Sequence, residues 1–205
     1  MPKKKGLTQM EIDQLAEIAN IGGGNASTAL SHMLGKKVNM TVPESYTGDI
    51  QQIQRLLGSA DDEVLALFLK MYGDIDGAMA MIFTPKSALQ FVQLLTKTKH
   101  KKLADLHEMD QSALREVGNV LLGASITALS KFLDLNITYT IPDIAIDMLG
   151  AVMDSILLEV SQGEDKILSF KINLSIDGKK VGGDLYYLFD PISSAKILKI
   201  NNKKI

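Results

Sequence analysis

An internal repeat restricts the possible folds of this chain more than any other sequence feature. Residues 15–45 align without a gap on residues 114–144, at a constant offset of 99 positions, and 11 of the 31 aligned pairs are identical. The segment GAMAMIFTP at 77–85 resembles GDLYYLFDP at 183–191, at an offset of 106. The two copies therefore follow the same order, which predicts a duplicated unit of about 100 residues.

The repeat predicts one domain, 1–205, made of two units at about 8–97 and 107–201. A polar and basic segment near 96–105 is the expected linker between them. Each unit is expected to contain a long helix, a short strand ending in proline, two longer strands and a closing helix. The expected helices are 8–34 and 107–133, with closing helices that begin at Pro85 and Pro191. The expected strands are 38–42, 63–72, 78–83, 137–141, 166–176 and 181–189, and we also consider an additional strand within 151–160.

Composition excludes several classes of function. The chain has no cysteine, so it has no disulfides, cysteine–zinc sites or thiol nucleophiles. A net charge of −2 and an aromatic content of 5% argue against a nucleic-acid-binding protein. The basic start MPKKK is not followed by a long apolar run. We therefore expect no signal peptide, no transmembrane helix and a cytoplasmic location.

Each long helix is expected to have a core face and an opposite polar face. The expected core residues of the first helix are Leu15, Ile18, Gly22, Ala26, Ala29, Leu30 and Met33. Those of the second helix are Leu114, Val117, Leu121, Ser125, Ala128, Leu129 and Phe132. The polar face of the first helix carries Asp13, Glu17, Asn20 and Gly24 at i, i+4, i+7 and i+11, and the second helix matches it with Ser112, Glu116, Asn119 and Gly123.

The matching polar faces favour a shared function. Glutamate and asparagine on an exposed helix face are usually only solvated, and common descent alone leaves some identity behind. Core packing, however, does not explain a match on the outer face, and neighbouring positions have diverged, as in Gly22–Gly23 against Leu121–Leu122. Glycine destabilises a helix by about 1 kcal/mol relative to alanine. An exposed glycine at 24 and 123 therefore predicts that the backbone of a partner approaches closely there.

The pattern Asp/Ser-x-x-x-Glu-x-x-Asn, present twice, resembles the CheC/CheX/FliY phosphatases of bacterial and archaeal chemotaxis. The first copy is Asp13, Glu17 and Asn20, and the second is Ser112, Glu116 and Asn119. The resemblance implies an α/β (α+β) fold with two layers, internal pseudo-twofold duplication, and long motif helices packed outside a mainly antiparallel sheet. It also implies a hydrolase whose substrate is the aspartyl phosphate of the response regulator CheY.

The chemistry of this implied substrate suggests roles for the motif residues. An aspartyl phosphate needs one water held in line with its leaving carboxylate, and an amide can both accept and donate the required hydrogen bonds. Asn20 and Asn119 would orient this water. Glu17 and Glu116 would dock on the regulator's lysine, with a general-base role as the alternative. No cofactor of the chain's own is expected, since the divalent metal belongs to CheY.

Further expectations concern partners. Asp13, Ser112, Gly24 and Gly123 are candidate partner contacts. The segment 144–151 is apolar apart from Asp147, which predicts a buried strand or packed turn, or alternatively a binding patch for the family's deamidase CheD. We expect a monomer, with two sites that act independently. The alternative function is a non-catalytic adaptor that binds CheY or CheD. An enzyme acting on a small molecule is disfavoured, because no nucleophile–base pair, cofactor loop or metal cluster is found.

Overall fold

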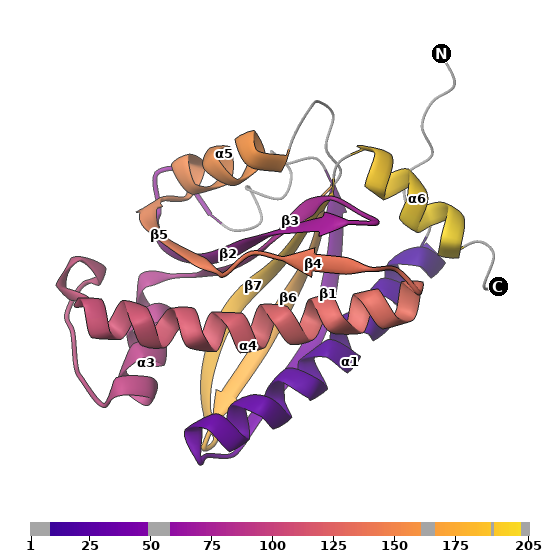
Figure 1. Cartoon of the computed structure of the whole chain (residues 1–205). Coiled ribbons are helices and arrows are strands. Elements are labelled where there is room, and N and C mark those ends of the chain that lie inside the picture. The colour runs from indigo at the N-terminus through magenta and orange to yellow at the C-terminus, as the bar shows by residue number, and fades with distance from the viewer. Residues whose placement is uncertain (1–8, 49–57, 161–166, 190, 202–205) are drawn as a thin grey trace.

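The structure, a computed structural model, describes residues 9–48, 58–160, 167–189 and 191–201, and its strands form one antiparallel sheet (Figure 1). The elements in chain order are α1 Gln9–Leu34, β1 Val38–Gly48, β2 Glu63–Gly73, β3 Gly77–Phe83, α3 Pro85–Thr96, η1 Leu103–Asp105, α4 Glu108–Leu133, β4 Ile137–Tyr139, β5 Asp143–Met148, α5 Leu149–Val160, β6 Ile167–Ile176, β7 Lys179–Phe189 and α6 Pro191–Asn201. The expected long helices and mainly antiparallel sheet are confirmed.

The sheet mixes strands from the two predicted units. Its order is β1-β6-β7-β3-β2-β4, and β5 also pairs with β2. At the centre, β3 pairs with β7, and Ala80 lies opposite Tyr186. These two residues occupy equivalent positions in the segments aligned at the offset of 106. Such a register is the one that a pseudo-twofold axis between β3 and β7 would produce, so it supports the proposed duplication.

The strand that follows each long helix is interrupted at its proline. The first, β1, pairs with β6 from Val38 to Gly48, but its register shifts between Thr41 and Glu44. Pro43 lies in this irregularity, as expected for a residue without a backbone N–H. In the second half the corresponding stretch is divided into β4 and β5 on either side of Pro142. β1 therefore runs further than the predicted 38–42, whereas β4 ends at Tyr139, before the predicted end at 141, and the separate strand β5 follows Pro142.

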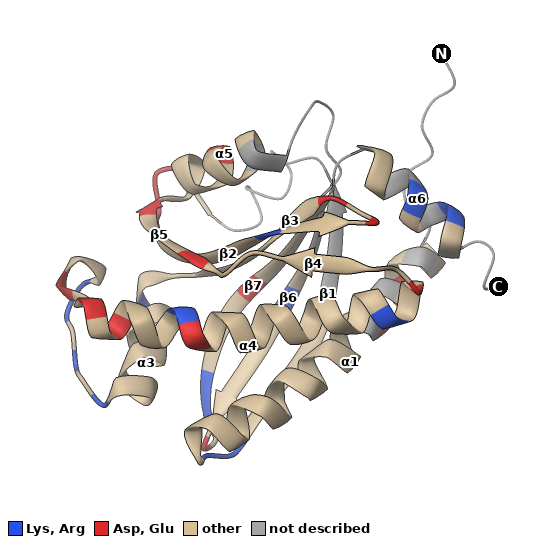
Figure 2. Ribbon diagram, viewed as in Figure 1, with Lys and Arg blue, Asp and Glu red and all other residues tan. Residues whose placement is uncertain are grey.

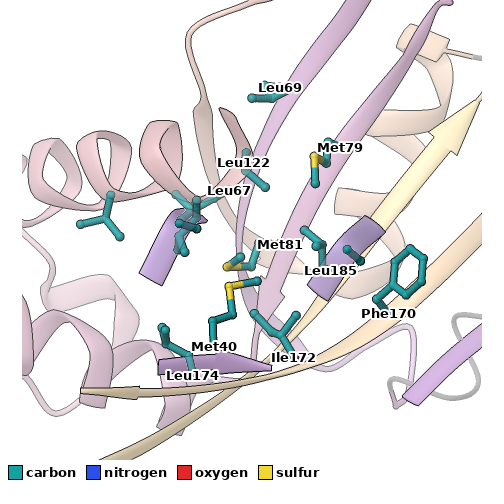
Figure 3. Packing of buried hydrophobic residues seen from close by; sticks show 14 of the residues in the cluster. Met40, Leu67, Leu69, Met79, Met81, Leu122, Phe170, Ile172, Leu174 and Leu185 are labelled. Atoms are coloured by element: carbon teal, nitrogen blue, oxygen red, sulfur yellow. The ribbon is translucent and has the colours of Figure 1, made fainter. Parts of the chain in front are cut away.

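One face of the sheet is covered by α1 and α4, which lie side by side (Figure 1). The large hydrophobic cluster between these helices and the sheet takes alternate residues from the strands, as the two-residue period of a strand requires. In Figure 3, Met40 of β1 and Met81 of β3 point toward one another, and Leu122 of α4 and Ile172 of β6 belong to the same cluster. This core fixes the motif helices on the sheet.

The opposite face of the sheet is partly covered by α5. Leu149, Val152, Met153 and Ile156 of this helix are buried in a second cluster that includes Tyr186 of β7. The additional strand considered within 151–160 is therefore wrong. The spacing of the four buried residues, i, i+3, i+4 and i+7, is helical, and a short apolar run alone does not distinguish a buried strand from a buried helix.

The expected core face of α1 is partly wrong. Ala26 and Leu30 are buried, but Ala29 and Met33 are exposed, and Ala19 is buried instead. The side chains of Leu15 and Ile18 lie outside the described residues. Of the seven residues expected on the core face of α4, Phe132 is half-buried and the other six are buried. The phase of α1 differs because small residues bring it into direct contact with α4.

Gly22 lies within this helix–helix contact. A Cβ atom at Gly22 would lie 2.9 Å from the Cα of Ser125 and 3.3 Å from the Cβ of Ala128. Gly23 is also buried, next to Met40 of β1, whereas Gly24 has no neighbouring atom within 4 Å of such a Cβ position. The run of three glycines therefore lies within a continuous helix, and two of the three allow close packing.

The segment between α3 and α4 is packed against the start of α4. His100 Nε2 lies 2.9 Å from Asp110 Oδ2, and the same carboxylate accepts a hydrogen bond from the backbone N–H of His107 at 3.0 Å. Burial alone would raise the pKa of Asp110, but the bonds from His107 and Thr96 and the nearby His100 lower it below its ordinary value. An acidic residue in the first helical turn also interacts favourably with the positive end of the helix dipole. The second motif helix thus has a well-fixed N-terminus.

The two glycines 22 and 24 give a matched test of the helix contact. We expect Gly24→Ala to raise the free energy of unfolding by about 0.5–1 kcal/mol, because alanine is the better helix former and nothing opposes its methyl group. We expect Gly22→Ala to lower it, because overpacking costs about 1–3 kcal/mol. Urea unfolding of both variants measures the difference. Equal stabilisation by both would contradict the close approach of α1 to α4.

Candidate functional site

The second motif lies on the outer face of α4. Ser112, Glu116 and Asn119 are all exposed. Glu116 and Asn119 are three residues apart, so their side chains are neighbours on the helix surface. Within the described part of the chain, neither side chain forms a hydrogen bond or an ion pair. A carboxylate and an amide are therefore presented together to the solvent, as the sequence predicted.

The first motif, on α1, has a different environment. Asp13 and Glu17 are exposed, and Asp13 Oδ1 accepts a hydrogen bond from Gln9 Nε2 at 2.9 Å. Asn20 is half-buried, and its Oδ1 accepts a hydrogen bond from the backbone N–H of Val42 at 2.9 Å. This N–H lies in the irregular part of β1, where the pairing with β6 is interrupted. The Asn20 side chain therefore replaces a missing strand partner.

The two motif glycines also differ. Gly24 is exposed with open space above it, as predicted. The expected exposure of Gly123 is wrong, because it is buried beneath the ring of Tyr139 in β4. A Cβ atom at Gly123 would lie 2.6 Å from the Tyr139 hydroxyl oxygen. The group that approaches this glycine closely is thus the chain's own tyrosine.

Tyr139 was not identified from the sequence. It lies beside Gly123, one helical turn from Asn119, and its side chain is 36% exposed. It therefore borders the polar face of α4. The repeat position in the first half is Met40, which is buried next to Gly23. In the sequence, this difference between the two halves is visible only as methionine at position 40 and tyrosine at the matching position 139.

Several other polar identities of the repeat have internal roles. Thr28 and Thr127 donate hydrogen bonds to the carbonyl oxygens of Gly24 and Gly123, at 3.1 and 2.8 Å. Ser130 Oγ donates to the Leu135 carbonyl at 2.6 Å. Its counterpart Ser31 donates instead to the Ser27 carbonyl at 2.7 Å and accepts from the Val38 N–H at 3.0 Å. Internal bonds therefore account for these identities, although the partners of the two serines differ. Glu17, Glu116 and Asn119 have no such internal partner among the described residues, so an external role explains their match better.

Asp147 lies on a separate element. It is exposed on β5, opposite Val64 of β2, and its Oδ1 accepts a hydrogen bond from the backbone N–H of Met148 at 2.7 Å. The neighbouring residues 144–146 are half-buried, and α5 begins at Leu149, so the buried strand or packed turn predicted for 144–151 is only partly correct. The structure therefore does not bring Asp147 onto the helix faces that carry the two motifs.

Another charged residue beside the second motif is tied to the fold. Arg115 Nη2 lies 3.9 Å from Asp143 Oδ1, at the start of β5. Such a partly exposed ion pair contributes little stability.

Within the described ranges, no three His, Asp or Glu side chains are clustered in a way that could hold a metal ion. No described helix is long and apolar enough to cross a membrane. The chemistry that this surface itself offers is hydrogen bonding by carboxylate and amide.

The environment of the two asparagines predicts different effects on stability. Asn20→Ala removes the acceptor of the buried Val42 N–H, so we expect the free energy of unfolding to fall by about 1–3 kcal/mol. Asn20→Asp keeps an acceptor oxygen and should retain most of the stability. Asn119→Ala should leave stability unchanged within about 0.5 kcal/mol. Equal losses for Asn20→Ala and Asn119→Ala in urea unfolding would contradict this assignment.

Two protein families match separate parts of the chain, and each match includes one of the two motifs. The CheC-like family matches residues 10–46, which cover α1 and most of β1. The family of the chemotaxis phosphatase CheX matches residues 65–155, which cover β2 to α5 and include the second motif.

Comparisons with individual proteins give similar results. The CheY-P phosphatase CheC of Bacillus subtilis is 36% identical over 166 residues, which are 80% of this chain and 79% of that protein. The crystal structure of FliY from Thermotoga maritima matches with a TM-score of 0.78 at 22% identity and covers 98% of this chain and 100% of that one. A complex of CheX with CheY, BeF3 and Mg2+ from Borrelia burgdorferi matches with a TM-score of 0.50 at 18% identity, covering 88% of this chain and 99% of that one.

The two structures support the fold. The length and identity of the match to CheC show that the chain belongs to the CheC-like family.

Proposed function

We propose that this protein is a phosphatase that hydrolyses the aspartyl phosphate of the chemotaxis response regulator CheY. The observation that carries the proposal is the matched Glu-x-x-Asn pair on two helices, whose members at 17, 116 and 119 have no partner within the described residues. The relative with 36% identity is a CheY-P phosphatase, and the structural relative CheX occurs in a complex with CheY. Both support CheY-P as the substrate.

The chemistry follows from what an amide can do. The phosphoryl group on an aspartate is already reactive, so the main requirement is a water placed in line with the leaving carboxylate. Asn119 lies on a convex, exposed helix face that can enter the active site of another protein. Its carboxamide would hold the water by accepting and donating hydrogen bonds, which is catalysis by positioning. Water then gains a bond to phosphorus as the bond to the aspartyl oxygen breaks.

The glutamates are proposed as docking residues. A carboxylate beside a phosphoryl group is repelled unless a cation lies between them. A lysine of the regulator would provide that cation and pair with Glu17 or Glu116, which sets the register of the helix. Because each glutamate lies on the same helix face as its asparagine, this pairing would place the amide over the phosphorus. A general-base role is the alternative.

The two sites are proposed to act independently but unequally. The Asn119 amide is exposed, whereas the Asn20 oxygen already accepts a hydrogen bond from Val42. Orienting a water at the first site would compete with that bond. The second site is therefore expected to provide most of the activity, with Tyr139 beside it as an additional contact for the partner. Asp13, Ser112 and Gly24 would contact the partner at the edges of the motifs.

The remaining parts of the proposal concern the cofactor, the oligomeric state and the location of the protein. The chain would need no cofactor of its own, since the divalent metal would be bound by CheY. A monomer is proposed, because the central β3–β7 pair already joins the two halves in one sheet. A cytoplasmic location would place the protein with its proposed substrate.

Phosphate release from CheY-P tests the proposed activity. We expect Asn119→Asp to remove the larger part of the acceleration and Asn20→Asp the smaller part. The double variant should lose roughly a hundredfold or more of the activity. Aspartate is used because it preserves the acceptor for the Val42 N–H.

Asn173→Ala is the matched control, because Asn173 is an exposed asparagine on β6, whose buried neighbours Ile172 and Leu174 face the helices. It should retain full activity. A parent protein that binds CheY-P without accelerating its decay would instead indicate the non-catalytic adaptor.

A second partner is proposed for β5. Asp147 is exposed on this strand, and Met148 beside it is 54% exposed, so a small surface at the strand's end is accessible. We propose this surface as a contact for the deamidase CheD. Asp147→Lys is expected to weaken CheD binding at least tenfold, since reversing a contact charge costs more than about 1.4 kcal/mol. Calorimetric titration with CheD measures this, with Asp154→Lys on α5 as the control. Unchanged affinity for Asp147→Lys would exclude this surface.

A further inference from the structure

Four lysines from three separate segments line one cleft near the turn between β6 and β7. The cleft has a volume of about 480 Å³ and is lined by Lys36, Lys97, Lys179 and Lys180, together with Gln90 and Gln93. Lys36 follows α1, Lys97 follows α3, and the other two lysines begin β7. Figure 2 shows basic residues at the turn after α1 and at the start of β7, where these segments meet.

Hydrogen bonds between the three segments fix the walls of this lysine cleft. Lys36 Nζ donates to the carbonyl oxygen of Leu94 in α3 at 2.6 Å. The backbone N–H of Asp177 donates to the Lys37 carbonyl at 2.9 Å, and the Lys37 N–H donates to Asp177 Oδ1 at 3.1 Å. The turn after α1 is therefore bonded to both other segments. The concave surface is part of the folded backbone and does not depend on mobile side chains alone.

The charge of the lysine cleft is not balanced within the described residues. Asp177 is the one carboxylate that lines it, and this group already accepts a backbone hydrogen bond. None of the four lysines forms an ion pair with a described carboxylate. Burial and then the neighbouring Lys97 lower the pKa of Lys36, and the opposite effect of the Asp177 carboxylate does not cancel them. A bound anion would relieve this repulsion.

A purely structural explanation covers only half of the cluster. Cations near a helix C-terminus are stabilised by the helix dipole, and Lys36 and Lys97 both lie at the C-terminal end of α3. Lys179 and Lys180 belong to a hairpin and gain nothing from this dipole. The helix dipole therefore does not explain why these two lysines line the same cleft as the other two.

We propose that the lysine cleft binds a small anion that carries a polyphosphate group, such as tripolyphosphate or a nucleoside triphosphate held by its phosphates. Lysine ammonium groups and glutamine amides are suitable donors for phosphate oxygens. Among the described residues, Leu94 is the one apolar residue of the lining and no aromatic ring lines the cleft, so they give a nucleobase no surface for stacking. A concave site of this size suits a small molecule better than a flat membrane surface.

Calorimetric titration with tripolyphosphate, ATP and adenosine, in EDTA and at constant ionic strength, tests this binding. We expect tripolyphosphate and ATP to bind with similar affinity and adenosine not to bind. Lys179→Gln/Lys180→Gln should weaken tripolyphosphate binding by about tenfold or more, because two charged hydrogen-bond donors are lost. Lys97→Gln, on a different segment, should weaken it as well, which provides a test that does not depend on the hairpin.

The control is Lys99→Gln/Lys101→Gln, which removes the same charge from exposed positions that do not line the cleft. It should lower the affinity clearly less than the cleft variants do, since neither side chain lines the cleft. Absence of tripolyphosphate binding, or equal losses of affinity in both double variants, would each overturn the proposal. Because the readout is binding, its outcome does not depend on the proposed phosphatase activity.

Discussion

The antiparallel pairing of β3 with β7 is the interaction on which the rest of the structure depends. With Ala80 opposite Tyr186, the strands of both halves form one sheet, in which β1 joins β6 while β4 and β5 join β2. The helix that precedes β1 and the helix that precedes β4 are thereby brought to the same face. Gly22 allows them to touch there without a separating side chain. The helices that carry the two motifs thus pack on one sheet and share one hydrophobic core.

Equal motifs do not have equal surroundings in this fold. The Asn20 amide satisfies a backbone N–H at the irregularity of β1, whereas Asn119 has no internal bond among the described residues. Tyr139 covers Gly123, but Met40 is buried at the corresponding place in the first half. The two asparagines are identical in the repeat, but among the described residues only the Asn119 amide is free of an internal hydrogen bond. If the proposed activity is correct, the first asparagine combines a structural and a catalytic role, and the second is free to serve catalysis alone.

The sequence predicted those features that depend on local patterns. Helical spacing identified the long helices and their polar faces, and prolines 85 and 191 marked the closing helices. It did not identify α5, because a short apolar run fits either a buried strand or a buried helix. It misplaced the core face of α1, because glycines add no apolar side chain to the pattern and yet form the contact with α4. The bonds of Asn20 with Val42 and the position of Tyr139 on Gly123 are tertiary contacts that spacing does not encode.

The decay rate of phosphorylated CheY, measured with the parent chain and with the Asn20→Asp/Asn119→Asp double variant, tests the central claim most directly. The claim is that the two motif amides themselves promote hydrolysis of a phosphate held by another protein. It predicts that the parent accelerates the decay and that the folded double variant leaves the rate at that of CheY-P alone. Equal acceleration by the parent and the double variant would contradict it, because the chemistry would then reside elsewhere in the chain.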